Sequence, residues 1–311
     1  MIYPTFFESK SSQNLFGLEN YFNFISKLYL KQKLPKVIML TGNKGIGKAT
    51  FVNHFLHSIF DIKNYNLEKF TKSKNSTFSN QFQNNIFSNI IYISGADFKS
   101  VKVEDIRNLK TKILKSAISN KDRFIVFDDI ELFNHNSLNA LLKIIEEPSE
   151  KNYFFLINNK SKPLLETIKS RAIEIKIILT ENQRLEIIDK LVTFLKLELV
   201  LDPKTSKLSP GNFVKFNYMC KEYNISPSND LVDNLSKLLD LYKKNKNILF
   251  INLALFIVDH YFIFLKNKNL LNKDKIFDIK NYIFENLNSL IMYNINQNSF
   301  INAVSEKLKH G

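Results

Sequence analysis

The nine residues Gly42-Asn-Lys-Gly-Ile-Gly-Lys-Ala-Thr50 constrain the fold more than any other stretch of this sequence. They follow an apolar run, Val37–Leu40, which predicts a short buried strand ending at Thr41. They precede a segment, Phe51–Phe60, whose apolar residues recur at helical spacing. Three of the chain's seven glycines lie in this stretch, and glycine is costly in ordered backbone unless unusual dihedral angles or a close ligand require it. Strand, glycine loop and helix in this order predict a phosphate-binding loop.

The loop supplies the groups that a bound phosphate needs. Its backbone amides and the positive end of the following helix dipole can surround an anion, and Lys48 can reach the terminal oxygens. A plain glycine turn is the alternative, and the lysine directly after the last glycine argues against it. We therefore predict a site for ATP or ADP, with these nucleotide-binding candidates: Gly42, Asn43, Lys44, Gly45, Ile46, Gly47, Lys48, Ala49 and Thr50.

One position departs from the usual phosphate-loop pattern. The residue after the lysine is usually Ser or Thr, whose hydroxyl ligates Mg²⁺, but here it is Ala49. Thr50 follows one place later, where a helical side chain points about 100° away, so it is a poor substitute. We expect the loop to hold phosphates better than the metal, with Mg²⁺ bound weakly or not at all.

The composition is that of a globular protein with more than one domain. The 311 residues suggest two or three domains, with 44% hydrophobic and 24% charged residues. A single cysteine, Cys220, excludes a disulfide framework and a cysteine-rich zinc module, so no zinc is expected. The first residues lack the pattern of a signal peptide, and the apolar stretch Ile248–Leu265 is too short and too polar in its middle for a membrane span. We expect a cytoplasmic protein without a membrane partner.

The chain is strongly basic, with a net charge of +14 and a pI near 9.5. Such a charge is compatible with a polyanionic partner such as nucleic acid. The sequence is also rich in Lys, Asn, Ile and Phe, a bias that nucleotide composition alone can produce, so charge by itself leaves nucleic-acid contact open.

Apolar runs that alternate with helical patterns predict an α/β fold for the first half of the chain. An amphipathic helix is expected before Pro35; ahead of it, Leu15 and Phe16 are either an apolar wall for a nucleotide base or plain core residues. Residues 61–89 are polar and predict an exposed insertion or long loop. Further strands are predicted at 90–93, 124–127, 153–157 and 173–178, and further helices at 103–117, 136–147 and 164–170. This order indicates a mostly parallel sheet with helices on both faces.

Polar side chains follow two of the predicted strands. Asp128 and Asp129 come after the strand at 124–127, and Asn158 and Asn159 after the strand at 153–157. Open α/β sheets bind ligands at the carboxyl ends of their strands, so Asp128 is a candidate Mg²⁺ ligand and Asp129 a candidate for orienting the attacking water. Either asparagine would contact a γ-phosphate or its water. The alternative is that these residues are ordinary turn and cap residues.

Beyond Thr180 the pattern becomes helical throughout. Helices are expected at 181–201 and 212–222, and periodic apolar residues continue from Ser228 to Leu308. No glycine occurs between Gly211 and Gly311, as suits continuous helices with short polar connections.

Two motifs resemble the clamp-loader ATPase subunits of bacterial DNA polymerase III. They are Asn139-Ala-Leu-Leu-Lys-Ile-Ile-Glu-Glu-Pro148 and the later Ser170-Arg171, while Gly45–Thr50 look most like the delta-prime branch of that family. The resemblance covers about residues 12–178 well and is weak or only architectural beyond. It implies an AAA+ nucleotide-binding domain over 1–178, a small helical lid over 179–217, and an all-α collar domain that oligomerises over 218–311.

The resemblance also implies roles for single residues. Lys48 matches the phosphate-loop lysine, Asp128 and Asp129 the second acidic motif, and Asn158 or Asn159 the first sensor. Arg171 matches the arginine finger that the family presents in trans to a neighbouring subunit's nucleotide. An arginine suits that role because it is always charged and can fork onto a γ-phosphate.

Several positions depart from the family pattern. Ala49 replaces the metal-ligating hydroxyl, Asp129 stands where a motor subunit carries Glu, and Asn212 stands where the lid often supplies a sensing Arg. The family's cysteine cluster is absent from residues 61–89, and Ala172 replaces the cysteine that usually follows the finger arginine. The first three changes weaken hydrolysis in cis, whereas the trans-acting arginine is retained.

The resemblance therefore implies an accessory, stator-like subunit that is a weak or non-catalytic ATPase within a nucleotidyltransferase complex. Its partners would be the other clamp-loader subunits, delta and tau/gamma, with primed DNA and the sliding clamp reached through the complex. Two alternatives remain open at this point: an active ATPase motor of the same machine, and a small-molecule P-loop kinase. The kinase would need an acceptor-binding lid, and it leaves the helical last third of the chain unexplained.

Overall fold

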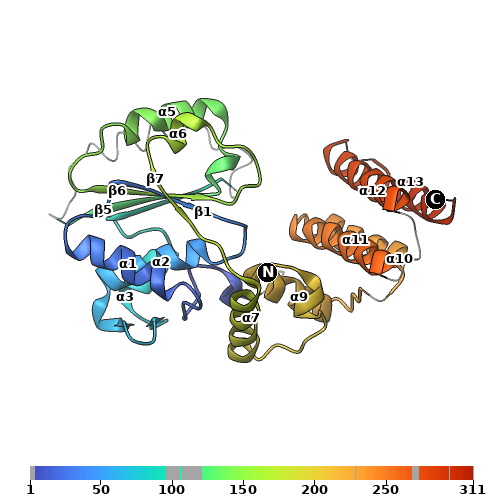
Figure 1. Ribbon diagram of the computed structural model, residues 1–311, viewed down its shortest axis with the longest axis horizontal. Helices are drawn as coiled ribbons and strands as arrows, with labels where there is room; N and C mark the ends of the chain where they lie inside the picture. The colour runs from blue at the N-terminus through green and yellow to red at the C-terminus, as the bar shows by residue number, and fades with distance from the viewer. Residues whose placement is uncertain are drawn as a thin grey trace. The chain divides into compact units, whose positions relative to one another are not determined.

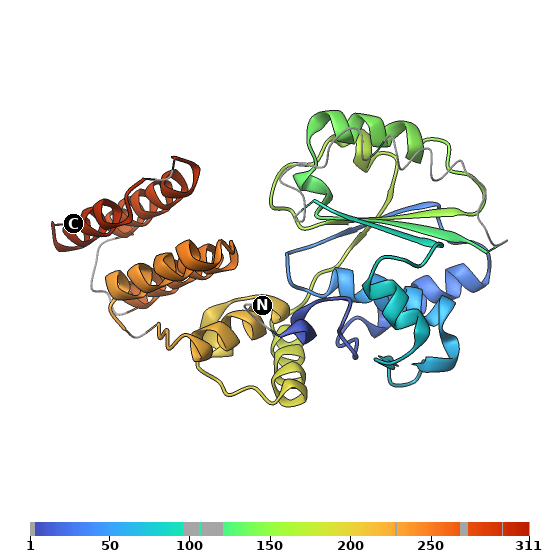
Figure 2. The same cartoon turned by 180° about the vertical axis from the view of Figure 1, so that it is seen from behind.

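The computed structural model describes residues 4–95, 106, 121–227, 229–267, 273–293 and 295–310. The chain forms two compact units, one of Pro4–Leu195 with Leu208–Asn212, the other of Lys196–Lys207 with the residues from Phe213 onward. Figures 1 and 2 show the first as a sheet between helices and the second as helices alone. The expected division into 1–178, 179–217 and 218–311 remains a prediction.

The described part of the first unit contains a parallel five-stranded sheet in the order β4-β5-β6-β1-β7. Its strands are β1 (Val37–Thr41), β4 (Ile90–Ser94), β5 (Arg123–Asp128), β6 (Asn152–Asn158) and β7 (Ile173–Lys176). Helices α1 (Glu19–Leu30), α2 (Lys48–Phe60) and α3 (Thr77–Gln83) lie below the sheet in Figure 1, and α5 (His135–Ile145) and α6 (Glu166–Lys169) lie above it. The predicted α/β fold with helices on both faces is confirmed. Of the predicted helix 103–117, only Ile106 lies within the described residues.

The central strands β1, β5 and β6 are apolar in their middle residues because both faces of the sheet are covered there, whereas the edge strand β7 alternates Ile with Glu and Lys and is largely exposed. Successive residues of a strand point to opposite faces of the sheet. In β5, Phe124 and Val126 belong to the core between the sheet and helices α1 and α2, whereas Ile125 and Phe127 belong to the core between the sheet and helices α5 and α6. All four side chains are fully buried. A short continuous run of apolar residues, which is the pattern of a strand buried on both faces, therefore predicts the central strands.

Aromatic rings fill the core on the side of α1 and α2. Phe55 of α2 contacts Phe124 and Phe155 edge-on, and Phe124 stacks on Tyr153 with ring centroids 5.3 Å apart. Leu15 is buried in this same core, as the plainer of its two interpretations expects. Aromatic pairs of this geometry add about 0.5–1.5 kcal/mol each beyond their burial, so this core anchors the helix that follows the glycine loop.

Residues 61–89, predicted as an exposed insertion or long loop, are folded against α2, so that prediction was wrong. They form η2 (Ile62–Asn64), the hairpin strands β2 (Tyr65–Asn66) and β3 (Thr71–Lys72), and α3. Phe78 and Phe82 of α3 are buried, and Phe78 stacks on Phe60 with centroids 5.9 Å apart. The segment is polar on average, so the sequence pattern did not reveal that a few buried aromatic side chains pack it against α2.

This attachment also buries basic groups. The Nδ1 atom of His57 lies 2.8 Å from the Asn53 carbonyl oxygen, its Nε2 lies 3.2 Å from Ser79 Oγ, and Lys72 donates to the Lys10 carbonyl at 2.7 Å. Burial lowers the pKa of His57 to about 3 and that of Lys72 to about 7. Both groups are therefore held largely in or near their neutral forms, because their surroundings offer no carboxylate to offset the loss of water.

The second unit is helical in its described part. Its helices are α8 (Pro203–Ser206), the main part of α9 (Pro210–Glu222), α10 (Leu231–Asn245), α11 (Leu249–Asn267), α12 (Lys273–Tyr293) and α13 (Gln297–His310). The last four form a bundle in which α10 packs on α11 and α13, and α12 on α11 and α13. Part of α11, Leu249–Lys266, is long and apolar enough to cross a membrane by length and composition, but residues such as Leu253 and Val258 are buried within the bundle. A helix in the core of a helical bundle can be as long and as apolar as a helix that crosses a membrane.

The helix predicted at 181–201 is shorter in the structure. It is α7 (Glu181–Leu195), and Lys196 adopts a left-handed backbone conformation with φ of 52°. Within the second unit, Asn217 Oδ1 accepts hydrogen bonds from the amides of Val200 and Leu201, at 2.8 and 3.0 Å. A distant side chain thus replaces the helical partners of these amides, which the local apolar pattern did not reveal.

The buried lysine makes a testable contribution to stability. The unfolded chain keeps its Lys72 proton up to about pH 10.4, whereas the folded chain releases it near pH 7, so the free energy of unfolding should rise between these values. Lys72→Met should remove that rise, which is at most about 1.4 kcal/mol per pH unit, and should stabilise the protein at pH 7 by about 1 kcal/mol. Urea titrations across this range measure both. Exposed Lys69→Met is the control, and equal pH slopes in the two variants would contradict the expectation.

Candidate functional site

The glycines of the loop between β1 and α2 are required by its backbone. Gly45 and Gly47 have φ of +87° and +100°, in the left-handed region that other residues avoid. A side chain at Gly42 would place its Cβ 2.5 Å from Ile46 Cδ1 and 2.6 Å from the Ile177 carbonyl oxygen. The loop is therefore a tight turn that delivers the chain onto the N-terminus of α2.

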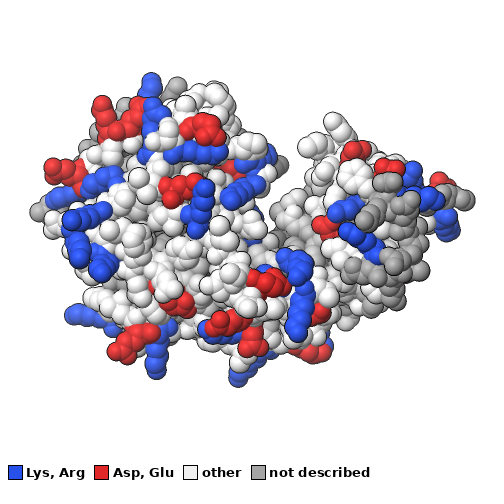
Figure 3. Space-filling view, viewed as in Figure 1, with Lys and Arg blue, Asp and Glu red and all other residues white. Residues whose placement is uncertain are grey.

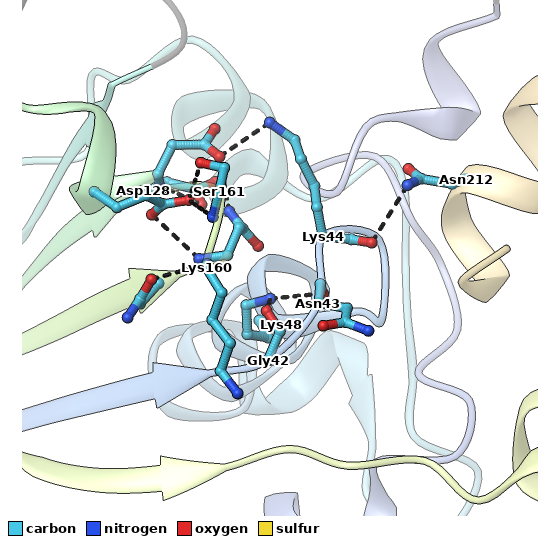
Figure 4. A network of polar contacts seen from close by, with 12 residues as sticks. Gly42, Asn43, Lys44, Lys48, Asp128, Lys160, Ser161 and Asn212 are labelled. Carbon is cyan, nitrogen blue, oxygen red and sulfur yellow. Dashed lines mark hydrogen bonds and ion pairs between the residues drawn. The ribbon is translucent and has the colours of Figure 1, made fainter. Parts of the chain in front are cut away.

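The carbonyl groups of the loop are held by a distant segment of the same unit. Ser209 Oγ donates to the Lys44 carbonyl at 2.6 Å, Gly211 N donates to the Gly45 carbonyl at 2.8 Å, and Asn212 Nδ2 lies 3.4 Å from the Lys44 carbonyl (Figure 4). No described residue accepts a hydrogen bond from the backbone amides of residues 43–47. These amides, at the start of a 13-residue helix, form a concave set of donors suited to an anion.

Lys48 is turned into the loop. Its side chain is buried, and Nζ donates to the carbonyls of Gly42 at 2.6 Å and Asn43 at 2.9 Å (Figure 4). Burial lowers its pKa to about 8, against the opposing attraction of Asp128, Glu131 and Asp129. A phosphate in the loop would favour the charged form, so Lys48 is placed and poised to bind one.

The two acids after β5 are both engaged by protein groups. Asp128 accepts from the Tyr92 hydroxyl at 2.7 Å and from the Asp129 amide at 2.9 Å. Burial raises the pKa of Asp128 above its ordinary value. Asp129, with a left-handed φ of 50°, accepts from Lys44 Nζ at 3.0 Å and Asn159 Nδ2 at 2.7 Å, both on Oδ1.

The asparagines after β6 lie beside the loop, but they differ in their contacts. The Asn158 carbonyl accepts from the Gly42 amide at 3.2 Å, and its Oδ1 accepts from the Lys160 amide at 2.9 Å. Asn159 directs its side chain to Asp129, as described above. Parallel strands ending at one edge of the sheet thus bring the loop, both acids and both asparagines together.

Sequence reasoning missed Glu131, which is buried beside these groups. Its carboxylate accepts from the Asn159 amide at 3.1 Å and from the Ser161 hydroxyl at 2.8 Å. It thereby ties the segment after β5 to the turn after β6. The available signal was its place two residues after Asp129, at the same sheet edge.

The side chains present do not fit Mg²⁺. Ala49 has no side-chain oxygen and packs against the apolar core, so the hydroxyl that ligates Mg²⁺ in a phosphate loop is missing. Asp129 Oδ1 is held by Lys44 and Asn159, and the Lys44 ammonium places a positive charge where the metal would lie. A polyphosphate is the ligand that this donor set suits.

Arg171 lies apart from the loop's hydrogen-bond network. It follows α6, its Nε and Nη2 each contact Glu146 Oε1 at 2.7 Å, and Nη1 donates to the Thr167 carbonyl at 2.9 Å. Its hydrogen bonds and ion pair reach no residue of the phosphate loop. About a third of the Arg171 side chain is exposed, so the guanidinium lies at the surface over α5 and α6.

Comparison with known proteins gives a family match. The model of a family described as DNA polymerase III, delta subunit, matches residues 17–180. A DNA polymerase III subunit delta' from Buchnera aphidicola of Schizaphis graminum is 30% identical over 61% of this chain and 60% of its own length. The subunit delta' of Buchnera aphidicola of Acyrthosiphon pisum is 23% identical over 87% of this chain and 85% of its own length.

Other similarities are weaker. A DNA polymerase III subunit gamma from Buchnera aphidicola of Schizaphis graminum is 26% identical over 56% of this chain and 47% of its own length. This chain spans 60% and 42% of two subunit delta' relatives from Buchnera. Among solved structures, a gamma subunit-related protein of Thermotoga maritima gives a TM-score of 0.45 at 17% identity, covering 93% of this chain and 97% of that one.

The lysine in the loop predicts how nucleotide affinity should vary with pH. Because its pKa is about 8 in the free protein, the ammonium that attracts phosphate is lost above that pH, and the affinity for ADP should then fall. The limit is about tenfold per pH unit. Lys48→Met should bind ADP more weakly and lose this dependence, as measured by calorimetry at several pH values. Exposed Lys143→Met is the control; unchanged affinity in Lys48→Met would remove the phosphate-loop assignment.

Proposed function

Because the chain belongs to the family described as DNA polymerase III, delta subunit, we propose that it is an accessory, stator-like subunit of a DNA polymerase III clamp loader. The family expected from the Asn139–Pro148 and Ser170-Arg171 motifs is confirmed by the match and by the relatives named subunit delta'. The subunit would support the ATP-dependent loading of a sliding clamp onto primed DNA.

The observation that favours an accessory role over a motor role is the state of Asp129. A water-orienting acid needs a carboxylate that can turn towards the attacking water. The orientation of the Asp129 carboxylate is fixed by Lys44 and Asn159, which both donate to Oδ1, and its side chain is only 9% exposed. Together with Ala49, this arrangement supports nucleotide binding without efficient hydrolysis in cis. Bound ATP or ADP would contribute more to the stability of this subunit than to driving clamp loading by hydrolysis.

The partners follow from the family. We propose that the chain assembles with delta and tau/gamma subunits in the cytoplasm, and that it meets primed DNA and the clamp through that complex. The basic residues do not by themselves define a DNA surface: on the face in Figure 3, Lys and Arg are scattered with Asp and Glu among them. The helical bundle of α10–α13 would serve as the oligomerisation collar.

The alternative is an active motor of the same complex. Relatives named subunit gamma match this chain, and the loop keeps its three glycines and Lys48. A motor would require steady ATP turnover by the isolated chain, whereas the accessory role requires binding with negligible turnover. Co-purification from native lysate, with identification of the bound proteins, tests the assembly itself.

Arg171 provides the sharpest test of the accessory role. Arg171→Ala should leave the fold and the chain's own nucleotide affinity nearly unchanged, because its contacts lie at the surface. ATP turnover by the reconstituted complex should fall by roughly 10³-fold or more at the site that the finger completes. Arg171→Lys should restore little, since a lysine does not reproduce the planar fork.

The matched control is Lys169→Ala, which removes a neighbouring exposed ion pair with Glu166 and should leave turnover unchanged. Analytical gel filtration would establish that each variant still assembles. A complex that assembles with Arg171→Ala and hydrolyses ATP at the full DNA-stimulated rate would contradict the finger role.

A further inference from the structure

The acid after β5 is neutralised by a lysine of the phosphate loop itself. Lys44 Nζ lies 3.0 Å from Asp129 Oδ1, and the two residues are joined across 85 positions of the sequence. The Asp129 side chain is 9% exposed, whereas that of Lys44 is 57% exposed. The carboxylate is therefore a buried, fixed group, whereas the Lys44 side chain reaches it from the exposed phosphate loop; Lys44 is labelled in Figure 4.

The Lys44 ammonium supplies, next to Asp129, the positive charge that a divalent cation would otherwise supply. The hydroxyl that usually ligates Mg²⁺ is missing at Ala49, Asp128 accepts from Tyr92, and Asp129 Oδ1 is held by Lys44 and Asn159. The Lys44 ammonium already supplies a positive charge next to Asp129, and a divalent cation placed there would be repelled by it.

We propose that Lys44 is a tethered cation that replaces Mg²⁺, so that this site binds nucleoside di- or triphosphates in their metal-free form. The proposal rests on the proposed nucleotide site and specifies the form of its ligand. Lys48 binds the phosphate that the loop amides surround, and Lys44 contacts the outer phosphate oxygens while remaining near Asp129.

The anchoring of Lys44 fits this role. Its backbone carbonyl is held by Ser209 and Asn212, so the base of the side chain is fixed while its end is free to turn. The Lys44 side chain is 57% exposed, so its ammonium can turn to contact a phosphate oxygen while it stays near Asp129, which Asn159 continues to hold. The charge-assisted hydrogen bond to the phosphate is stronger than a bond between neutral groups.

Calorimetry of ADP binding to the full chain tests the proposal. The apparent ADP affinity of the unmodified protein should be higher in EDTA than in excess magnesium, because magnesium binds the free nucleotide and removes the metal-free form that the site takes. Lys44→Met should lose about tenfold in affinity in EDTA, the loss of one charge-assisted contact. Lys63→Met, an exposed lysine of η2, should change nothing. Thermal unfolding should show that both variants remain folded.

Restoring the metal ligand gives a second, independent readout. Ala49→Thr alone should still bind ADP more tightly in EDTA than in magnesium, like the unmodified protein, because Lys44 still pairs with Asp129, whereas Lys44→Met with Ala49→Thr should bind ADP more tightly in magnesium than in EDTA. Binding of Mn²⁺ to the double variant, followed by electron paramagnetic resonance, should appear only with ADP present.

Two results would overturn the inference. One is an unmodified protein whose ADP affinity falls about tenfold or more in EDTA, which would show that a metal is required. The other is an unmodified protein that binds ADP in neither buffer, which would remove the nucleotide site. The second result leaves the accessory-subunit role intact if the complex still depends on Arg171, so the two failures are distinguishable.

Discussion

The burial of one parallel sheet on both faces is the constraint on which the rest of the first unit depends. The middle residues of strands such as β1, β5 and β6 must be apolar, so polar residues occur at the ends of these strands. In register, Thr41 of β1 pairs with Asn158 of β6. The register of the parallel strands therefore places the glycine loop, the two acids and the asparagines at the same edge of the sheet.

This constraint explains what the sequence could predict. The end of β1 at Thr41 and the start of α2 were visible because strand, loop and helix are local patterns. The shape of residues 61–89 was not visible, since a few rings such as Phe78 and Phe82 decide it against a polar background. The non-helical conformation of Val200 and Leu201 depends on Asn217, and the orientation of Asp129 depends on Lys44. Contacts between residues far apart in sequence leave no periodic signal.

The charged groups at the loop are paired within the chain. Buried acids and lysines are costly unless paired, and here Lys44 and Asn159 satisfy Asp129, while the loop carbonyls satisfy Lys48. Segment 208–212 holds the outer side of the loop through Ser209 and Gly211. The loop therefore keeps the shape that a phosphate requires, and the entropy of ordering it is lost on folding and not again on binding.

The two charged networks differ in burial, and that difference supports the proposed roles. Arg171 and Glu146 are 35% and 43% exposed, and a pair in that environment contributes about 0–1 kcal/mol, so a phosphate presented by a neighbouring subunit would displace Glu146 at little cost. Asp129 is 9% exposed and held by two donors, so releasing it to orient a water would leave a buried charge partly unpaired. A surface arginine that can exchange its partner and a buried acid that is held in place are what we would expect of the proposed accessory subunit, which would complete a neighbour's site more readily than its own.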